Sequence, residues 1–258
     1  MRTDEVVEAL RLPEECLRDV RVPKGKLVDQ GGFTAADQRR LRDGIEELRW
    51  VAVVKPTVVG IRGHDDGVRC VPELQVMTLQ LRAGAAAARV NELVHRVFPL
   101  PLILVTTTGS EEGSGPIVSM ALKRLSQGQA ERAVLDGDVL SAQLSAFGPE
   151  GSELERIFLR ELALGKQPQT DLLALYEGWM DRVLALVAAR VTGVFKTSET
   201  VEQAKERRSA LEEMSKLELD LARLYSGARK EKQTSRQVDL NLEIKRLQAR
   251  LVEAKGKL

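Results

Sequence analysis

The sequence predicts an α+β fold, with a mixed central β-sheet and flanking helices followed by further helices. Up to Gly148, short apolar segments with the period of a strand alternate with segments that have the period of a helix, which indicates a sheet with helices packed on it. Beyond Gly148 only the helical period continues. We therefore expect an α+β domain over residues 1–148, a helical segment packed on it over 149–195, and a C-terminal helical hairpin or coiled coil over 196–258.

Residues 71–81 are expected to form the central strand of this sheet. Leu74 and Val76 alternate with Glu73 and Gln75, so the strand is predicted to be half-buried, with two unlike faces. Glu73 and Gln75 lie two residues apart, and side chains at that spacing on a strand point to the same face. One face of the central strand therefore carries a carboxylate and an amide side by side.

The residues before this strand predict two helices, an extended segment, two short strands and a turn. Thr34 is the expected N-cap of the second helix, with Asp37 three residues later as an acidic variant of the capping box. Leu41, Ile45 and Leu48 are spaced by four and three residues, so this helix is predicted to continue through Leu48 with one buried face. In chain order the expected elements are a helix at 4–10, extended chain at 19–26, a helix at 34–48, strands at 50–54 and 58–61, and a turn at 63–67.

After the central strand the sequence predicts a helix, a buried strand and an antiparallel pair of strands that widens the sheet. The run at 102–106 is wholly apolar, which is typical of a strand covered on both faces. The second strand of the pair also fits a partly helical segment. In chain order the expected elements are a helix at 85–98, the strand at 102–106, a loop at 109–116, strands at 117–125 and 133–144, and helices at 152–164 and 171–191.

The charged C-terminal part carries two apolar seams with the spacing of a coiled coil. Each seam covers about three heptads or fewer, so each arm needs a partner, which is the other arm, the α+β domain, a second copy or another protein. Two arrangements fit the sequence: an antiparallel hairpin that turns near Ser226 and Gly227, or one long bent helix. The first seam comprises Leu211, Met214, Leu217, Leu221 and Leu224, and the second comprises Leu240, Ile244, Leu247 and Leu251.

Charge and composition argue against several classes of protein. The 39 basic and 38 acidic residues leave a net charge of +1, so any attraction to nucleic acid or membrane must be local. Only 3% of the residues are aromatic, which disfavours a base-stacking surface. Cys16 and Cys70 stand alone, and no apolar run approaches the ~20 residues of a membrane span. We expect a soluble cytoplasmic protein with reduced thiols.

One candidate site is a magnesium-dependent nuclease centre. The predicted order of helix, two strands, acidic turn, strand, helix and strand follows the core of the PD-(D/E)XK nucleases, with Glu46 or Glu47 as the acid on the helix at 34–48. Asp66 and Glu73 would bind Mg²⁺, while Gln75 takes the place of the lysine that positions or activates water. Because an amide carries no positive charge, the sequence leaves catalysis undecided. In the alternative, Asp66 closes a turn, and Glu73 and Gln75 lie on a solvated strand face.

A second candidate site is a basic tract in the C-terminal part. Its cations are opposed locally only by Glu231, and such a tract gives salt-dependent, sequence-independent affinity for phosphates. Gln233 and Asn241 would add hydrogen bonds to phosphate or to the backbone of a partner. In the alternatives, the tract is a solvated helix face and Asn241 fixes helix register. The cations are Arg223, Arg229, Lys230, Lys232 and Arg236.

Short motifs spread over most of the chain carry a family resemblance. They are VPKGK (22–26), IEELRW (45–50), KPTVVGI (55–61), ELQV (73–76), HRVFPLP (95–101), KEKQ (230–233) and VDLN (238–241). In this order they resemble a bacterial family catalogued as domain of unknown function 4391. The resemblance implies genes that lie beside helicase and DNA-methyltransferase genes of restriction or antiphage-defence type.

These observations lead to one functional expectation and two alternatives. The expected protein is a non-catalytic accessory subunit of a bacterial antiphage-defence or DNA-modification system, which needs no cofactor and binds a helicase partner, DNA or both. The first alternative is the Mg²⁺-dependent nuclease, intact or degenerate. The second is a structural protein that self-assembles through its C-terminal helices.

Overall fold

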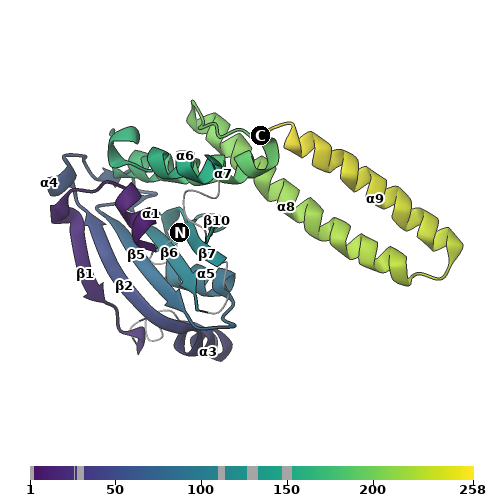
Figure 1. Cartoon of the computed structure of the whole chain (residues 1–258), viewed down its shortest axis with the longest axis horizontal. Helices are drawn as coiled ribbons and strands as arrows, with labels where there is room; N and C mark the ends of the chain where they lie inside the picture. The colour runs from purple at the N-terminus through teal and green to yellow at the C-terminus, as the bar shows by residue number, and fades with distance from the viewer. Residues whose placement is uncertain (1–2, 26, 28–31, 110–113, 127–132, 147–152) are drawn as a thin grey trace. The chain divides into compact units, whose positions relative to one another are not determined.

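The computed structural model describes residues 3–25, 27, 32–109, 114–126, 133–146 and 153–258. The chain divides into two compact units, Met1–Val183 and Leu184–Leu258. The first contains the sheet and the second contains a pair of long helices (Figure 1).

A mixed six-stranded sheet with the order β1-β2-β5-β6-β7-β10 forms the centre of the first unit (Figure 1). Strands β5 and β6 are parallel and are connected by helix α5 (Ala87–Val97), whereas the other neighbours in the sheet are antiparallel. This arrangement confirms the predicted α+β class. The strands are β1 (Leu17–Arg21), β2 (Ile45–Val54), β5 (Leu74–Leu81), β6 (Leu102–Thr108), β7 (Ser114–Met120) and β10 (Leu140–Ser145).

Helices α3 (Ala35–Gly44) and α5 pack on one face of the sheet. Leu41 of α3 and Leu93 of α5 share a buried apolar cluster with Leu79 of β5. In α7, the hydroxyl of Tyr176 accepts a hydrogen bond from the Ala121 N–H and donates one to the Leu102 carbonyl, both at 2.9 Å, which fixes this helix to the strands. Further helical segments are α1 (Thr3–Ala9), α6 (Glu153–Glu161), α7 (Leu172–Thr192) and the short turns Glu14–Cys16 and Leu164–Lys166.

The second predicted helix is shorter than the apolar spacing indicated. Thr34 caps it as expected, accepting a hydrogen bond from the Asp37 N–H at 3.3 Å, but the helix ends at Gly44. Ile45 begins strand β2, so the prediction of a helix through Leu48 is wrong. Hydrogen bonding to β1 and β5 holds these residues in a strand. Both partner strands lie far away in the sequence, so the local spacing of apolar residues did not indicate this pairing.

The predicted strand at 58–61 is also wrong, because Pro56–Val59 form the short helix α4. Pro56 occupies its first turn, and Gly60, with a φ of +71°, ends it in the left-handed conformation. The acidic turn that follows belongs to a small hairpin of β3 (His64–Asp65) and β4 (Cys70–Val71).

The central strand β5 is more buried than its alternating pattern suggested. Residues Leu74 to Met77 are buried in succession, so the prediction of a half-buried strand with one solvated face is wrong there. The reason is its position between β2 and β6 in the interior of the sheet, where side chains on both faces pack against other elements.

The sheet is widened by an antiparallel pair, β7 and β10, as predicted. Each of the two long predicted strands is interrupted, however. The end of the first, β8 (Lys123–Leu125), and the start of the second, β9 (Ala133–Leu135), form a separate two-stranded sheet. The predicted loop at 109–116 lies partly outside the described residues, and β7 begins within it at Ser114.

The second unit contains the antiparallel hairpin of α8 (Val201–Lys230) and α9 (Thr234–Lys255), so the alternative of one long bent helix is excluded (Figure 1). Met214 and Leu217 of α8 and Ile244 of α9 are buried in the predicted seams. An ion pair between Arg250 and Glu213 (2.9 Å) joins the two helices. No helix within the described ranges combines the length and the apolar composition that crossing a bilayer requires.

Candidate functional sites

The turn between α8 and α9 gathers most of the predicted basic tract. We call residues 229–236 the hairpin tip. Arg229, Lys230, Lys232 and Arg236 are all exposed there, and within the described part of the chain none of them forms an ion pair with a carboxylate. Four cations from two helix ends and their link thus face solvent, with no described carboxylate within ion-pair distance.

Glu231 is the acid within the hairpin tip, and its charge is used to shape the turn. Its carboxylate accepts hydrogen bonds from the N–H groups of Lys232 and Gln233, both at 2.8 Å. These bonds, led by that from Gln233, lower the pKa of Glu231, and Arg236 contributes in the same direction. Four cations and one carboxylate leave the tip with a net charge of +3.

Gln233 also lies at the tip, whereas the other two predicted contact residues, Arg223 and Asn241, lie along the helices. Arg223 pairs with Asp220 on its own helix at 3.5 Å. Asn241 is exposed on α9, outside the buried seam, so a role in fixing the register of the hairpin is not supported by its position. It lies seven residues into α9, about 10 Å along the axis from the first residue of the helix.

The predicted metal ligand Asp66 lies in the turn of the β3–β4 hairpin. Its Oδ1 accepts hydrogen bonds from the N–H groups of Val68 (2.8 Å) and Arg69 (2.6 Å), and its Oδ2 lies 3.3 Å from Nε2 of His64. These donors, led by Arg69, lower the pKa of Asp66 to about 2. This geometry is that of an aspartate that closes its own turn.

The other three residues of the predicted nuclease set occupy different environments. Glu73 lies just before β5, and Nζ of Lys55 is 3.8 Å from its Oε2. Gln75 is buried, and its Oε1 has no hydrogen-bond partner among the described residues. Glu46 is exposed on strand β2, so its predicted place on a helix is wrong.

Lys55 was not among the predicted site residues. It lies beside Glu73 because the end of β2 pairs with the start of β5, with Val54 opposite Leu74. The described residues contain no group of three His, Cys, Asp or Glu side chains arranged to hold a metal ion. A cation therefore lies next to Glu73, but it is Lys55 and not a lysine at position 75, where the nuclease pattern expects it.

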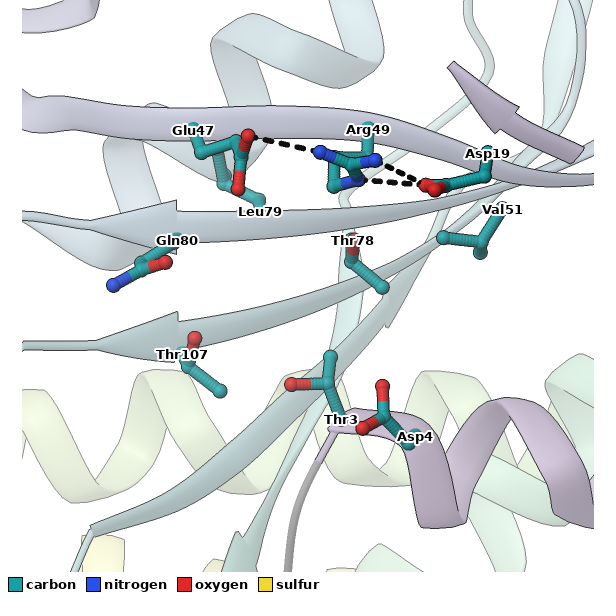
Figure 2. Close-up of a pocket in the computed structure, with 10 residues that line it drawn as sticks. All are labelled: Thr3, Asp4, Asp19, Glu47, Arg49, Val51, Thr78, Leu79, Gln80 and Thr107. Atoms are coloured by element: carbon teal, nitrogen blue, oxygen red, sulfur yellow. Dashed lines mark hydrogen bonds and ion pairs between the residues drawn. The ribbon is translucent and has the colours of Figure 1, made fainter. Parts of the chain in front are cut away.

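A polar hollow on the sheet was also missed. Arg49 of β2 lies between two carboxylates, with Nε 2.8 Å from Asp19 and Nη1 3.0 Å from Glu47 (Figure 2). Thr78 and Gln80 of β5 lie across the hollow from them (Figure 2). Its volume of about 200 Å³ is below the roughly 300 Å³ at which ligand pockets begin. The alternation of polar residues in β2 and β5 was the available signal, and the arrangement is an ion network on a half-buried stretch of sheet.

The comparison with known families covers nearly the whole chain. The family described as "Domain of unknown function (DUF4391)" matches residues 10–251, which includes parts of both compact units. The chain belongs to this family. No curated protein and no solved structure gives a significant match.

This DUF4391 chain also buries a group of polar side chains between α5 and the sheet. Nε2 of His95 lies 3.1 Å from the hydroxyl of Ser119, and the hydroxyl of Thr106 donates to the Asn91 side-chain oxygen at 2.8 Å. All four residues are at least 98% buried. His95 is therefore a core residue.

Lys123 completes this group from strand β8. Its ammonium donates a hydrogen bond to the carbonyl of Phe98, the residue that ends α5, where a cation is favoured by the helix dipole. Burial lowers the pKa of Lys123 to about 7. Burial, followed by the nearby charge of Lys123, lowers the pKa of His95 to about 3. The interior of this chain thus favours the neutral imidazole of His95.

Proposed function

We propose that this DUF4391 protein is a cytoplasmic, non-catalytic accessory subunit of a bacterial antiphage-defence or DNA-modification system. In this proposal the hairpin tip binds DNA phosphates, the hairpin also engages a helicase partner, and the sheet-containing unit acts as the scaffold. The observation that carries the proposal is the group of four exposed cations at the tip, none of which has an ion-pair partner in the described chain. The resemblance of the motifs to a family encoded beside helicase and methyltransferase genes supports the assignment to such a system.

The chemistry of the tip favours phosphate as its ligand. Cations that are not neutralised by neighbouring acids release counterions from DNA when they contact it, so each contact strengthens binding at low salt. Four contacts predict that the logarithm of the affinity falls with the logarithm of the salt concentration with a slope of about −3 to −4. Because the tip offers few groups that read bases, affinity should depend little on sequence.

The test is binding of a fluorescent DNA duplex to the full chain, followed by anisotropy over a series of salt concentrations. Changing Arg229, Lys230, Lys232 and Arg236 together to Gln should weaken binding about a hundredfold at low salt and reduce the salt slope to near zero. The matched control changes four exposed lysines on the same helices to Gln, namely Lys205, Lys216, Lys245 and Lys255. Equal losses in the two variants would contradict a role for the tip.

A metal-dependent nuclease is the second candidate function, and the ion pair between Lys55 and Glu73 favours it. A lysine beside a metal-binding carboxylate supplies the positive charge that Gln75 lacks. This candidate predicts DNA or RNA cleavage that requires Mg²⁺ or Mn²⁺ and is lost in both Glu73→Gln and Lys55→Met. Glu14→Gln serves as the control, because Glu14 is an exposed carboxylate outside the predicted nuclease set. Cleavage that survives Glu73→Gln would remove this residue from the mechanism.

A further inference from the structure

A shallow groove runs along one side of α9. It is lined by four charged and two apolar residues: Asp239, Leu242, Glu243, Arg246, Leu247 and Arg250. The charged residues are spaced by four, three and four positions, which places them on one side of the helix. The groove lies wholly within the second unit.

The charges in this groove change sign at its midpoint. Asp239 and Glu243 lie in the N-terminal half, and Arg246 and Arg250 lie in the C-terminal half. If α9 is turned end over end, each acid comes to the position of a base. The apolar residues obey the same symmetry, because Leu242 and Leu247 exchange places.

We propose that this groove is the dimer interface of the protein, occupied by α9 of a second copy in antiparallel orientation. Asp239 then faces Arg250 of the second copy, and Glu243 faces Arg246 of the second copy. Both contacts occur twice, as a two-fold axis requires. A parallel arrangement in register would instead set each charge against its own kind, so the pattern selects the antiparallel one.

The groups that this interface uses are available in the single chain. Asp239, Glu243 and Arg246 form no ion pair within residues 153–258. The Arg250 side chain, although paired with Glu213, is still 58% exposed. Leu242 is 51% exposed, and contact with Leu247 of the second copy would remove it from water. The inference does not depend on DNA binding by the tip.

Sedimentation velocity of the full chain, from low to high micromolar concentration, tests the proposal. The wild-type protein should sediment as a dimer. Glu243→Arg and Arg246→Glu should each weaken the dimer about tenfold or more, because each turns two attractive pairs into repulsive ones. Circular dichroism should show unchanged helix content, since neither residue has a partner in its own hairpin.

Two rescue experiments separate specific pairing from a general effect of charge. The double variant Glu243→Arg/Arg246→Glu restores opposite charges across the axis, and it should dimerise like the wild type. An equimolar mixture of the two single variants should form a heterodimer, because one then contributes two bases and the other two acids. Lys245→Glu, a reversal at the neighbouring position outside the groove, should have little effect. A wild-type monomer at all concentrations, or a double variant that stays monomeric, would overturn the proposal.

Discussion

The two histidines of the protein experience opposite electrostatic environments. His95 is enclosed by the core next to Ser119, and burial holds its imidazole neutral. His64 lies between two carboxylates, with Nδ1 3.1 Å from Asp171 and Nε2 3.3 Å from Asp66. The hydrogen bond with Asp171, more than that with Asp66, raises the pKa of His64 and outweighs the effect of its partial burial. The folded state therefore disfavours protonation of His95 and favours protonation of His64.

This contrast predicts that the two histidines contribute opposite pH dependences to the free energy of unfolding. Between about pH 3 and 6.5 the unfolded chain binds a proton at His95 that the folded chain does not, so the free energy of unfolding falls as the pH falls. Above pH 6.5 the folded chain keeps a proton on His64 that the unfolded chain loses, so the free energy of unfolding falls as the pH rises through the folded pKa.

Urea unfolding at pH 5, 6.5 and 8 provides the measurement. His95→Gln should flatten the acid side of the stability profile by more than about 1 kcal/mol, and His64→Gln should flatten the alkaline side by about 0.5–1 kcal/mol, the smaller effect reflecting its partial exposure. Each variant serves as the control for the other. Identical profiles in the two variants would contradict the assignment of these environments.

At the level of elements, local signals in the sequence predicted what local interactions determine. The Thr34 cap, the acidic turn and the two seams of the hairpin were all recognisable, because the residues that decide them lie within a few turns of each other. The hairpin tip was predictable for the same reason, since its four cations lie within eight consecutive residues around one turn.

The errors arose where distant segments decide the conformation. The spacing of Leu41, Ile45 and Leu48 fits a helix, yet Ile45 pairs with Leu81 and Leu48 with Leu79 as strand residues. The same pairing of β2 with β5 brings Lys55 next to Glu73. The register of this pairing shifts between Trp50 and Ala52, and the sequence does not reveal that shift. The buried polar group around His95 also combines residues from a helix and three strands, so no single segment of the sequence predicts it.

At the scale of the whole molecule, the two compact units separate the proposed tasks. The sheet and its helices lie in Met1–Val183, and the paired helices that carry both the tip and the groove lie in Leu184–Leu258. Both tryptophans, Trp50 and Trp179, belong to the first unit, so tryptophan fluorescence reports on that unit alone. The integrity of the scaffold can therefore be followed independently of the hairpin.

Removal of the residues after Lys196 should abolish co-purification with the proposed helicase partner while the tryptophan fluorescence stays native. The reason is that the hairpin offers exposed apolar side chains on both helices, such as Leu219 (60% exposed) and Val238 (53% exposed), which a protein partner can cover. The full chain with the four tip cations changed to Gln is the control, and it should retain the helicase if the shafts of the helices form the contact. Co-purification that persists after the truncation would place the partner's contact on the first unit and refute the assignment of partner binding to the hairpin.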